Sequence, residues 1–262
     1  MNKAFSVENL GFYYQAENFL FQQLNFELNK GDILAILGQN GCGKSTLLDL
    51  LLGIHRPIQG KIEVYQSIGF VPQFFSSPFA YSVLDIVLMG RSTHINTFAK
   101  PKSHDYQIAM QALDYLNMTH LANREFASLS SGQQQLILIA RAIASECKLM
   151  LLDEPTSALD LANQNTVLSL LQQLVKEHKL TIVFTTHQPN HAVAVANKVL
   201  LMNNKQNVLF GLTDDVLTAE NLTQLFYLPM LVQEAQYQNH GFTHFVPVYD
   251  SVLSGFHRIK KC

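Results

Sequence analysis

The chain has 262 residues, of which 48% are hydrophobic and only 15% are charged, and its formal net charge is −2. This length allows one large domain with a sizeable core, and the weak charge argues against a protein that mainly grips nucleic acid, because such proteins need a basic face. Three widely spaced cysteines (Cys42, Cys147 and Cys262) favour neither a zinc site nor a disulfide framework. No apolar run approaches about 18 residues and no signal segment is apparent, so we expect a cytoplasmic chain that reaches a membrane only through a partner.

The first quarter of the chain predicts strands around one buried helix. Residues 4–30 alternate apolar and polar side chains, which indicates antiparallel strands, and residues 61–65 repeat the pattern. Between them, the apolar run at 33–37 predicts a buried strand. The run at 47–52 predicts a buried helix that stops at Gly53.

Helices dominate the middle of the sequence, and strands and helices alternate after it. Residues 78–144 read mostly as helix. Strands are predicted at 149–152 and 182–184. The segment between these strands has a one-sided apolar face, formed by Val167, Leu170, Leu171, Leu174 and Val175. Alternation of this kind is typical of a parallel sheet covered by helices.

The last part of the chain gives weaker signals. Residues 199–202 and 207–210 predict a hairpin, and residues 215–262 predict one or two helices and a tail. Three histidines of this tail, His240, His244 and His257, have a spacing that fits no familiar ligand pattern, so we do not predict a metal site there.

Residues 38–46 carry the most specific pattern, because Gly38-Gln39-Asn40-Gly41-Cys42-Gly43-Lys44-Ser45-Thr46 fits G-x-x-x-x-G-K-[ST]. Glycines let the backbone bend so that its N–H groups face phosphates, and the N-terminus of the following helix adds positive charge. Lys44 can reach the β- and γ-phosphates, and the Ser45 hydroxyl can ligate magnesium. The alternative is a chance glycine-rich turn, but the flanking strand and helix provide the context that the motif needs.

Two adjacent carboxylates, Asp153 and Glu154, follow the apolar strand at 149–152. Neighbouring side chains of a strand point to opposite sides, so we expect different roles for the two acids. Asp153 can hold magnesium, directly or through water, and Glu154 can orient and polarise the water that attacks the γ-phosphate. An Asp-Glu pair by itself would more simply be interpreted as a solvated acidic turn at the end of a strand. The phosphate loop upstream favours the catalytic interpretation.

Small residues in Leu129-Ser130-Ser131-Gly132-Gln133 lead into a helix. The first turn of a helix exposes unpaired N–H groups, so this is a second candidate anion-binding end. Taken alone, the segment could be an ordinary helix start with Ser131 as the capping residue.

In order and spacing, residues 7–211 resemble the nucleotide-binding subunits of ABC transporters. Gly38–Thr46 resembles the Walker A motif of that family, Leu129–Gln133 its LSGGQ signature, and Leu149–Glu154 its Walker B motif. Val71-Pro72-Gln73 resembles the Q-loop, Ser157–Asp160 the D-loop, and Thr186-His187 the switch histidine. Ser131, Gln134 and Cys42 depart from the usual residues of the family, and we expect them to adjust rate or affinity rather than chemistry.

The resemblance implies an α/β fold with a P-loop NTPase (RecA-like) core. In this reading one ABC ATPase domain fills residues 1–262. The core and an antiparallel β subdomain take residues 1–75 and 145–214, a helical subdomain that carries the signature is inserted at 76–144, and a helical tail follows at 215–262.

The resemblance also implies ATP and Mg²⁺ as ligands and assigns residues to them. Glu154, His187 and Lys44 are the catalytic candidates, and Ser45, Gln73 and Asp153 are the metal ligands. Tyr14 is placed against adenine, although Tyr13 beside it leaves that choice open. The predicted nucleotide contacts are Tyr14, Gly38, Asn40, Gly41, Cys42, Gly43, Lys44, Ser45, Thr46, Ser130, Ser131, Gly132, Gln133 and Asp160.

The family pattern predicts a head-to-tail homodimer in which each signature completes the partner's site and Asp160 links the two sites. Two membrane permease subunits are expected to contact residues 74–91, with Phe75, Phe79, Leu88 and Met89 as candidates, and a periplasmic or surface binding protein is an indirect partner. The chain would then lie peripherally on the cytoplasmic face of the inner membrane. No nucleic-acid partner is expected.

Residues 85–91 and 211–218 are similar to one branch of the family, the ATPases of large bacterial importers for metal chelates. Those importers take up iron-siderophores, haem, cobalamin, molybdate or tungstate. The alternative is a soluble, non-transport ABC ATPase such as one for iron–sulfur cluster assembly. DNA-repair relatives need long coiled coils, and no heptad region occurs here. Within this branch, we expect an importer of a molybdate-type oxyanion or of an iron chelate.

Overall fold

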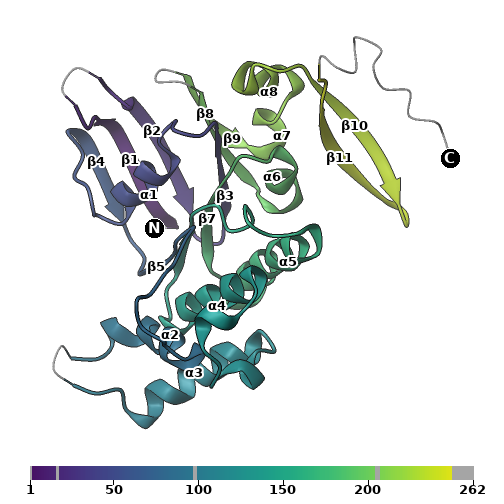
Figure 1. The fold of residues 1–262 in the computed structure, drawn as a ribbon. Coiled ribbons are helices and arrows are strands. Elements are labelled where there is room, and N and C mark those ends of the chain that lie inside the picture. The colour runs from purple at the N-terminus through teal and green to yellow at the C-terminus, as the bar shows by residue number, and fades with distance from the viewer. Residues whose placement is uncertain (1, 16–17, 97–98, 204–206, 250–262) are drawn as a thin grey trace.

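The computed structural model describes residues 2–15, 18–96, 99–203 and 207–249 (Figure 1). At its centre is a sheet in which all neighbouring strands are parallel except the last pair. The spatial order is β5 (Ile68–Val71), β6 (Leu149–Leu152), β7 (Thr181–Thr186), β3 (Ile33–Gly38), β8 (Lys198–Asn203) and β9 (Asn207–Leu212). The antiparallel pair β8–β9 confirms the predicted hairpin.

The central strands are apolar because both faces of the sheet are covered. All six residues of β3 are buried, and the five from Ile33 to Leu37 alternate between two hydrophobic clusters. Ala35 and Leu37 join the cluster that contains the larger helices, whereas Leu34 and Ile36 join the cluster on the opposite face. A parallel sheet covered on both faces has this composition, and the predicted α/β core is confirmed.

A second, antiparallel sheet lies beside the core (Figure 1). Its strands follow the order β2 (Phe21–Asn29), β1 (Lys3–Phe12) and β4 (Gln59–Val64). Helix α1 (Lys44–Leu51) shares one hydrophobic cluster with this sheet and with β3, so it is packed between the two sheets. The strands predicted in residues 4–30 and 61–65 are confirmed.

A helical lobe is inserted between β5 and β6 (Figure 1). It contains α2 (Val83–Leu88), α3 (Ser103–Tyr115), α4 (Ser131–Ala144) and the short 3₁₀ turns η1 (Met89–Thr93), η2 (Thr119–Leu121) and η3 (Phe126–Ser128). Arg91 is buried in this lobe, where its guanidinium donates to Asp105 at 3.3 Å, to the carbonyl oxygen of Ala144 at 2.8 Å and to Glu146 at 2.6 Å. Arg91 therefore ties η1 to α3 and to the end of α4.

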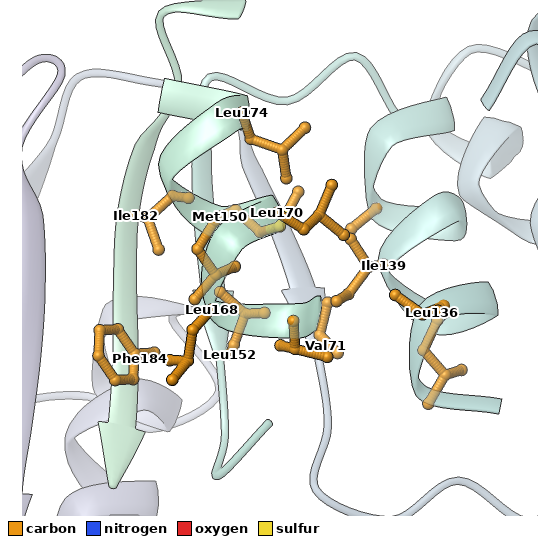
Figure 2. Close-up of a cluster of buried hydrophobic side chains, with 14 of the residues drawn as sticks. Val71, Leu136, Ile139, Met150, Leu152, Leu168, Leu170, Leu174, Ile182 and Phe184 are labelled. Atoms are coloured by element: carbon orange, nitrogen blue, oxygen red, sulfur yellow. The ribbon is translucent and has the colours of Figure 1, made fainter. Parts of the chain in front are cut away.

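Helix α5 (Leu161–His178) covers the core on the side of α4. Figure 2 shows its residues Leu168, Leu170 and Leu174 among side chains from the sheet and from α4. These contacts account for the one-sided apolar face that the sequence predicts for this helix.

Replacement of Leu174 by alanine tests this packing. Leu174 is fully buried, so the substitution should lower the free energy of unfolding by about 2–5 kcal/mol through lost burial and a residual cavity. Urea denaturation followed by circular dichroism measures the change. Leu161→Ala is the control, because Leu161 is 83% exposed and its loss should change stability by less than about 0.5 kcal/mol.

The C-terminal part differs from the predicted helical tail. After α6 (Pro189–Val195) and β9, the short helices α7 (Thr213–Val216) and α8 (Ala219–Phe226) lead into a β-hairpin of β10 (Met230–Tyr237) and β11 (His240–Pro247) that projects from the body (Figure 1). Gln238 and Asn239 at its tip both have positive φ, as a two-residue hairpin turn requires. The helical prediction for 215–262 is therefore wrong from Met230 to Pro247.

The side-chain amide of Asn190 in α6 is hydrogen bonded to the backbone of the hairpin. Asn190 accepts a hydrogen bond from the N–H of Phe245 at 2.8 Å and donates to its carbonyl oxygen at 3.1 Å. His244 lies against the same amide, whereas His257 lies outside the described residues. Among the residues that the structure describes, no group of three or more metal-binding side chains occurs, and no helix is long and apolar enough to cross a membrane.

Candidate functional site

The phosphate loop connects β3 to α1 and surrounds a cavity of about 470 Å³. Gly41 and Gly43 both have positive φ, and a side chain at Gly43 would collide with Leu20 and Phe21. Glycine is therefore required where the loop turns into the helix. The cavity is lined by Tyr14, Leu20, Asn40, Gly41, Gly43, Lys44, Ser45, Thr46, Gln73 and Glu154.

Lys44 is held inside this loop with only 6% of its surface exposed. Its Nζ donates to the carbonyl oxygens of Gly38 at 2.9 Å and Gln39 at 3.2 Å, and lies 3.4 Å from Oε1 of Glu154. A buried ammonium group needs such partners, and here they direct it toward the cavity.

Glu154 brings together three of the predicted site residues. Its side chain is 11% exposed; Oε1 faces Lys44, while Oε2 lies 3.3 Å from Nδ1 of His187 and 3.4 Å from Nε2 of Gln73. The Gln73 amide also lies 3.4 Å from the hydroxyl of Ser157. Elements far apart in the sequence thus converge on one carboxylate.

Asp153 and Glu154 do point in different directions, but the reason is not the alternation of a strand. Strand β6 ends at Leu152, and Glu154 has a left-handed φ of 43°. Oδ1 of Asp153 accepts a hydrogen bond from Thr185 at 2.6 Å, whereas the Glu154 side chain lines the cavity. A turn after the strand therefore separates the two acids.

Thr185 belongs to the site, although none of the sequence motifs includes it. Its hydroxyl donates to Asp153 and accepts the N–H of Glu154 at 2.8 Å. In the sequence, Thr185 is marked only by its position at the carboxyl end of a predicted strand. The pairing of Leu152 with Phe184 places the end of that strand beside the end of β6.

The signature segment lies at the start of α4 and does not line the cavity of its own chain. Ser130, not Ser131, is the capping residue: its hydroxyl accepts from the N–H of Gln133, and the Gln133 side chain accepts from the N–H of Ser130. This reciprocal cap leaves the Ser131 hydroxyl free to donate to the carbonyl oxygen of Ala158 at 3.3 Å.

The signature also packs against the start of α5. A Cβ atom added at Gly132 would lie 2.7 Å from the Asn163 amide, so a larger residue there would have to displace that amide. Asp160 caps α5, with its carboxylate accepting from the N–H and from the side-chain amide of Asn163. Ser131, Gly132 and Asp160 are therefore parts of one packed surface.

The two adjacent tyrosines have different surroundings. Tyr14 is 63% exposed, lines the cavity, and is hydrogen bonded through its hydroxyl to Thr46 at 3.1 Å. Tyr13 instead packs edge-on against Phe19, with 5.0 Å between the ring centroids. Tyr14 is thus the one of the two at the phosphate loop.

Cys42 is half-buried, and its thiol faces Gly38 at the end of β3. A Cβ atom added at Gly38 would lie 2.4 Å from the Cys42 sulfur. Burial raises the pKa of the Cys42 thiol, and the nearby charge of Lys44 partly opposes that effect. Because the thiolate is the reactive form, alkylation should be slow at pH 7 and accelerate as the pH rises toward the raised pKa.

We expect MgATP to protect Cys42 from N-ethylmaleimide, since nucleotide in the loop would close access to it. Mass spectrometry of a Cys262→Ser variant at pH 8 measures the labelling with and without nucleotide. Cys147 is the internal control: it is buried away from the cavity, and its slow labelling should not respond to nucleotide. Equal labelling of Cys42 in both conditions would argue against nucleotide in this loop.

Residues 74–91, the predicted contact region for the permease, expose only some of the apolar side chains proposed for that contact. Phe74 and Phe79 are 76% and 68% exposed. By contrast, Phe75 packs against Phe126 and Arg141, and Leu88 is buried in the core of the lobe. Met89 is also partly buried against that core, so Phe79 is the most exposed of the four predicted contact candidates, and Phe74 is an exposed residue that was not among them.

A larger cavity of about 800 Å³ lies between α6 and the hairpin β10–β11. Its lining contains none of the predicted site residues, so its size does not make it the functional site.

Comparison with known proteins identifies the family. The ABC transporter family profile matches residues 21–157. The chain is 81% identical over 253 residues to the molybdate import ATP-binding protein MolC of Haemophilus influenzae, and the alignment covers 97% of this chain and all of that protein. The chain belongs to the ABC transporter ATP-binding family. Membership of this family implies that the subunit binds nucleotide and hydrolyses ATP.

Other relatives of this ABC subunit agree in fold. It is 33% identical over 236 residues to the iron(3+)-hydroxamate import ATP-binding protein FhuC of Bacillus subtilis, covering 85% of this chain and 87% of that one. A chain from the structure of a metal-chelate type ABC transporter in an inward-facing conformation superposes with a TM-score of 0.93 at 80% identity, covering 96% and 100% of the two chains. A dimeric ATP-binding cassette with ADP and Pi bound superposes with a TM-score of 0.70 at 25% identity, covering 80% and 98%.

Proposed function

We propose that this chain is the ATP-hydrolysing subunit of a bacterial importer of the metal-chelate type, with molybdate or a related metal oxyanion as the cargo. The convergence of Lys44 and His187 on Glu154 at the mouth of the phosphate loop carries the catalytic part of the proposal. The name and 81% identity of the molybdate relative support the cargo. A soluble, non-transport ABC ATPase is not favoured, because the named relatives serve import.

In the proposed reaction, the N–H groups of the loop and the Lys44 ammonium bind the β- and γ-phosphates. Since Lys44 lies 3.4 Å from Glu154, a γ-phosphate on Lys44 stands beside that carboxylate. Glu154 then orients the attacking water and accepts its proton. His187 flanks the other carboxylate oxygen, and its second ring nitrogen is available for the γ-phosphate.

The side chains near the loop fit a magnesium ion. Mg²⁺ prefers oxygen ligands, and the Ser45 hydroxyl, the Gln73 amide oxygen and the Asp153 carboxylate supply them. Ser45 and Gln73 line the cavity, and Asp153 is 9% exposed with only Oδ1 engaged by Thr185. When bound, Mg²⁺ would help to neutralise the negative charge that develops on the phosphate oxygens during hydrolysis.

The signature residues are proposed to serve the nucleotide of a second copy of the chain. Residues 130–133 do not line their own chain's cavity, yet they form the capped N-terminus of α4, where N–H groups are available to an anion. A head-to-tail dimer would bring Ser130–Gln133, together with Asp160, to the partner's phosphate loop. The dimeric cassette among the similar structures supports this arrangement.

The membrane part of the proposal concerns the helical lobe. We infer that exposed Phe74 and Phe79 contact two permease subunits, because aromatic side chains on the surface can receive a short helix of another protein. The chain would then sit peripherally on the cytoplasmic face of the plasma membrane, and a substrate-binding protein would act through the permease.

Reconstitution of the complete complex tests the proposal. Turnover of ATP in proteoliposomes should rise when a binding protein loaded with molybdate or tungstate is added, and should not rise with ferric hydroxamate. Stimulation by the iron chelate alone would contradict the cargo. Full ATPase activity of the isolated chain, unaffected by permease subunits, would contradict the transport role.

A further inference from the structure

Thr185 is a buried hydroxyl that contacts both acids of the site. It lies near the end of β7 and is fully buried. Its Oγ1 donates to Oδ1 of Asp153 at 2.6 Å and accepts the N–H of Glu154 at 2.8 Å. One side chain from a neighbouring strand thus holds two consecutive residues of the turn after β6.

We propose that Thr185 is a positioning residue of the ATPase site, whose hydroxyl orients the Asp153 carboxylate and fixes the backbone turn that places Glu154 in the cavity. This inference rests on the proposed function and adds to it a residue that acts through the two acids. Thr185 itself does not line the cavity.

The contact to Asp153 selects one orientation of its carboxylate. A hydrogen bond of 2.6 Å to an ionised group is short and strong. It engages Oδ1, and Oδ2 has no hydrogen-bond partner within the part of the chain that the structure describes. Thr185 therefore leaves one oxygen of Asp153 available to a cation and prevents free rotation of the group.

The contact to Glu154 supports an uncommon backbone conformation. A φ of 43° is unfavourable for a residue other than glycine, so this turn persists only because its surroundings hold it. The hydrogen bond from the N–H of Glu154 to Thr185 is one of those constraints. The Glu154 side chain leaves the backbone at this turn. Its approach to Lys44, His187 and Gln73 therefore depends on the hydrogen bond to Thr185 as well.

Thr181 on the same strand provides a matched control. It is also fully buried, and its hydroxyl likewise makes two hydrogen bonds, donating to Gln66 at 2.8 Å and accepting the N–H of Gly31 at 3.1 Å. It lies at the opposite end of β7 and does not line the cavity. Thr181→Val and Thr185→Val therefore remove equivalent groups from the fold, and only the second affects the acids.

The test compares the full chain with Thr185→Val, Thr185→Ser and Thr181→Val. Thr185→Val should lower kcat on the order of 10-fold or more, because it leaves the N–H of Glu154 and an oxygen of Asp153 without their partner. It should also raise the Mg²⁺ concentration needed for half-maximal turnover. Thr185→Ser keeps the hydroxyl and should stay close to the unmodified protein, as should Thr181→Val.

A binding measurement separates positioning from general damage. The affinity for a fluorescent ATP analogue is measured with and without Mg²⁺. Thr185→Val should lose most of the gain in affinity that Mg²⁺ provides while keeping the affinity in its absence, and Thr181→Val should keep both. If Thr185→Val does not fold, Thr185→Cys replaces it with the same expectation, since a thiol is a weak donor and acceptor.

Two results would overturn the inference: a Thr185→Val protein that matches Thr181→Val in turnover and in its response to Mg²⁺, or a Thr185→Ser protein as impaired as Thr185→Val. Failure of the proposed function would look different, because the unmodified chain would then show no Mg²⁺-dependent ATP turnover.

Discussion

Replacement of Glu154 by glutamine is expected to slow ATP hydrolysis by about 10²–10⁴-fold, the usual contribution of a positioned general base. The amide keeps the shape of the side chain but cannot accept the proton of the attacking water. Nucleotide binding should persist, because Lys44 keeps its hydrogen bonds to the carbonyl oxygens of Gly38 and Gln39. The rate is measured as phosphate release under saturating MgATP.

The same variant should accumulate as an ATP-bound dimer, because ATP is proposed to close the two copies of the chain on each other and would no longer be hydrolysed. Size-exclusion chromatography with light scattering detects this species in the presence of ATP and its absence with ADP. Glu27→Gln is the control: Glu27 also faces a lysine, Lys3 at 2.6 Å, but on the exposed edge of the antiparallel sheet. Near-normal turnover of Glu154→Gln would refute the role given to Glu154.

The parts of the site that the sequence predicted are formed by short, continuous segments of the chain. Gly41 and Gly43 do occupy left-handed positions in the loop, and Lys44 begins the helix after it. Each of these features depends on a few consecutive residues, so a short pattern is sufficient to find it. The α/β core followed equally from apolar runs that suit strands covered on both faces.

Other features depend on contacts between distant segments and left little trace in the sequence. Thr185 became part of the site only because the register of β6 and β7 sets it opposite Asp153. The identity of the helix cap at Ser130 depended on the reciprocal side chain of Gln133, and the adjacent Ser131 looked equally suitable. Both features depend on which side chains are neighbours in space, and the local conformational propensity of the residues does not reveal this.

The C-terminal hairpin shows a different cause of error. Its strands contain β-branched and aromatic residues, but its turn, Gln238-Asn239, lacks the glycine that usually marks a two-residue hairpin. The hydrogen bond from Phe245 to Asn190 holds strand β11 against α6, and these two residues are 55 positions apart in the chain. A tertiary contact therefore stabilises a structure for which the local signal was weak.

Replacement of Lys44 by alanine should weaken ATP binding or hydrolysis sharply, by at least about 10²-fold in kcat/KM, because a desolvated charge–phosphate contact contributes several kcal/mol to transition-state stabilisation. The structure gives a second reason: Lys44 also neutralises Glu154, whose carboxylate is 11% exposed and would otherwise face the phosphates with an uncompensated negative charge. Isothermal titration with ATP and steady-state turnover measure the two effects separately.

Two further variants separate loss of the charge from damage to the loop. Lys44→Arg keeps a positive charge but presents a planar, bulkier group, so it should restore binding better than hydrolysis, which needs the cation in one place. Lys198→Ala is the matched control, because Lys198 at the start of β8 also pairs with a largely buried acid, Asp32 at 3.2 Å, but lies outside the cavity. If Lys44→Ala and Lys198→Ala impaired turnover equally, the loss would reflect a general weakening of the fold. If Lys44→Ala bound and hydrolysed ATP normally, the assignment of the phosphate loop would be wrong.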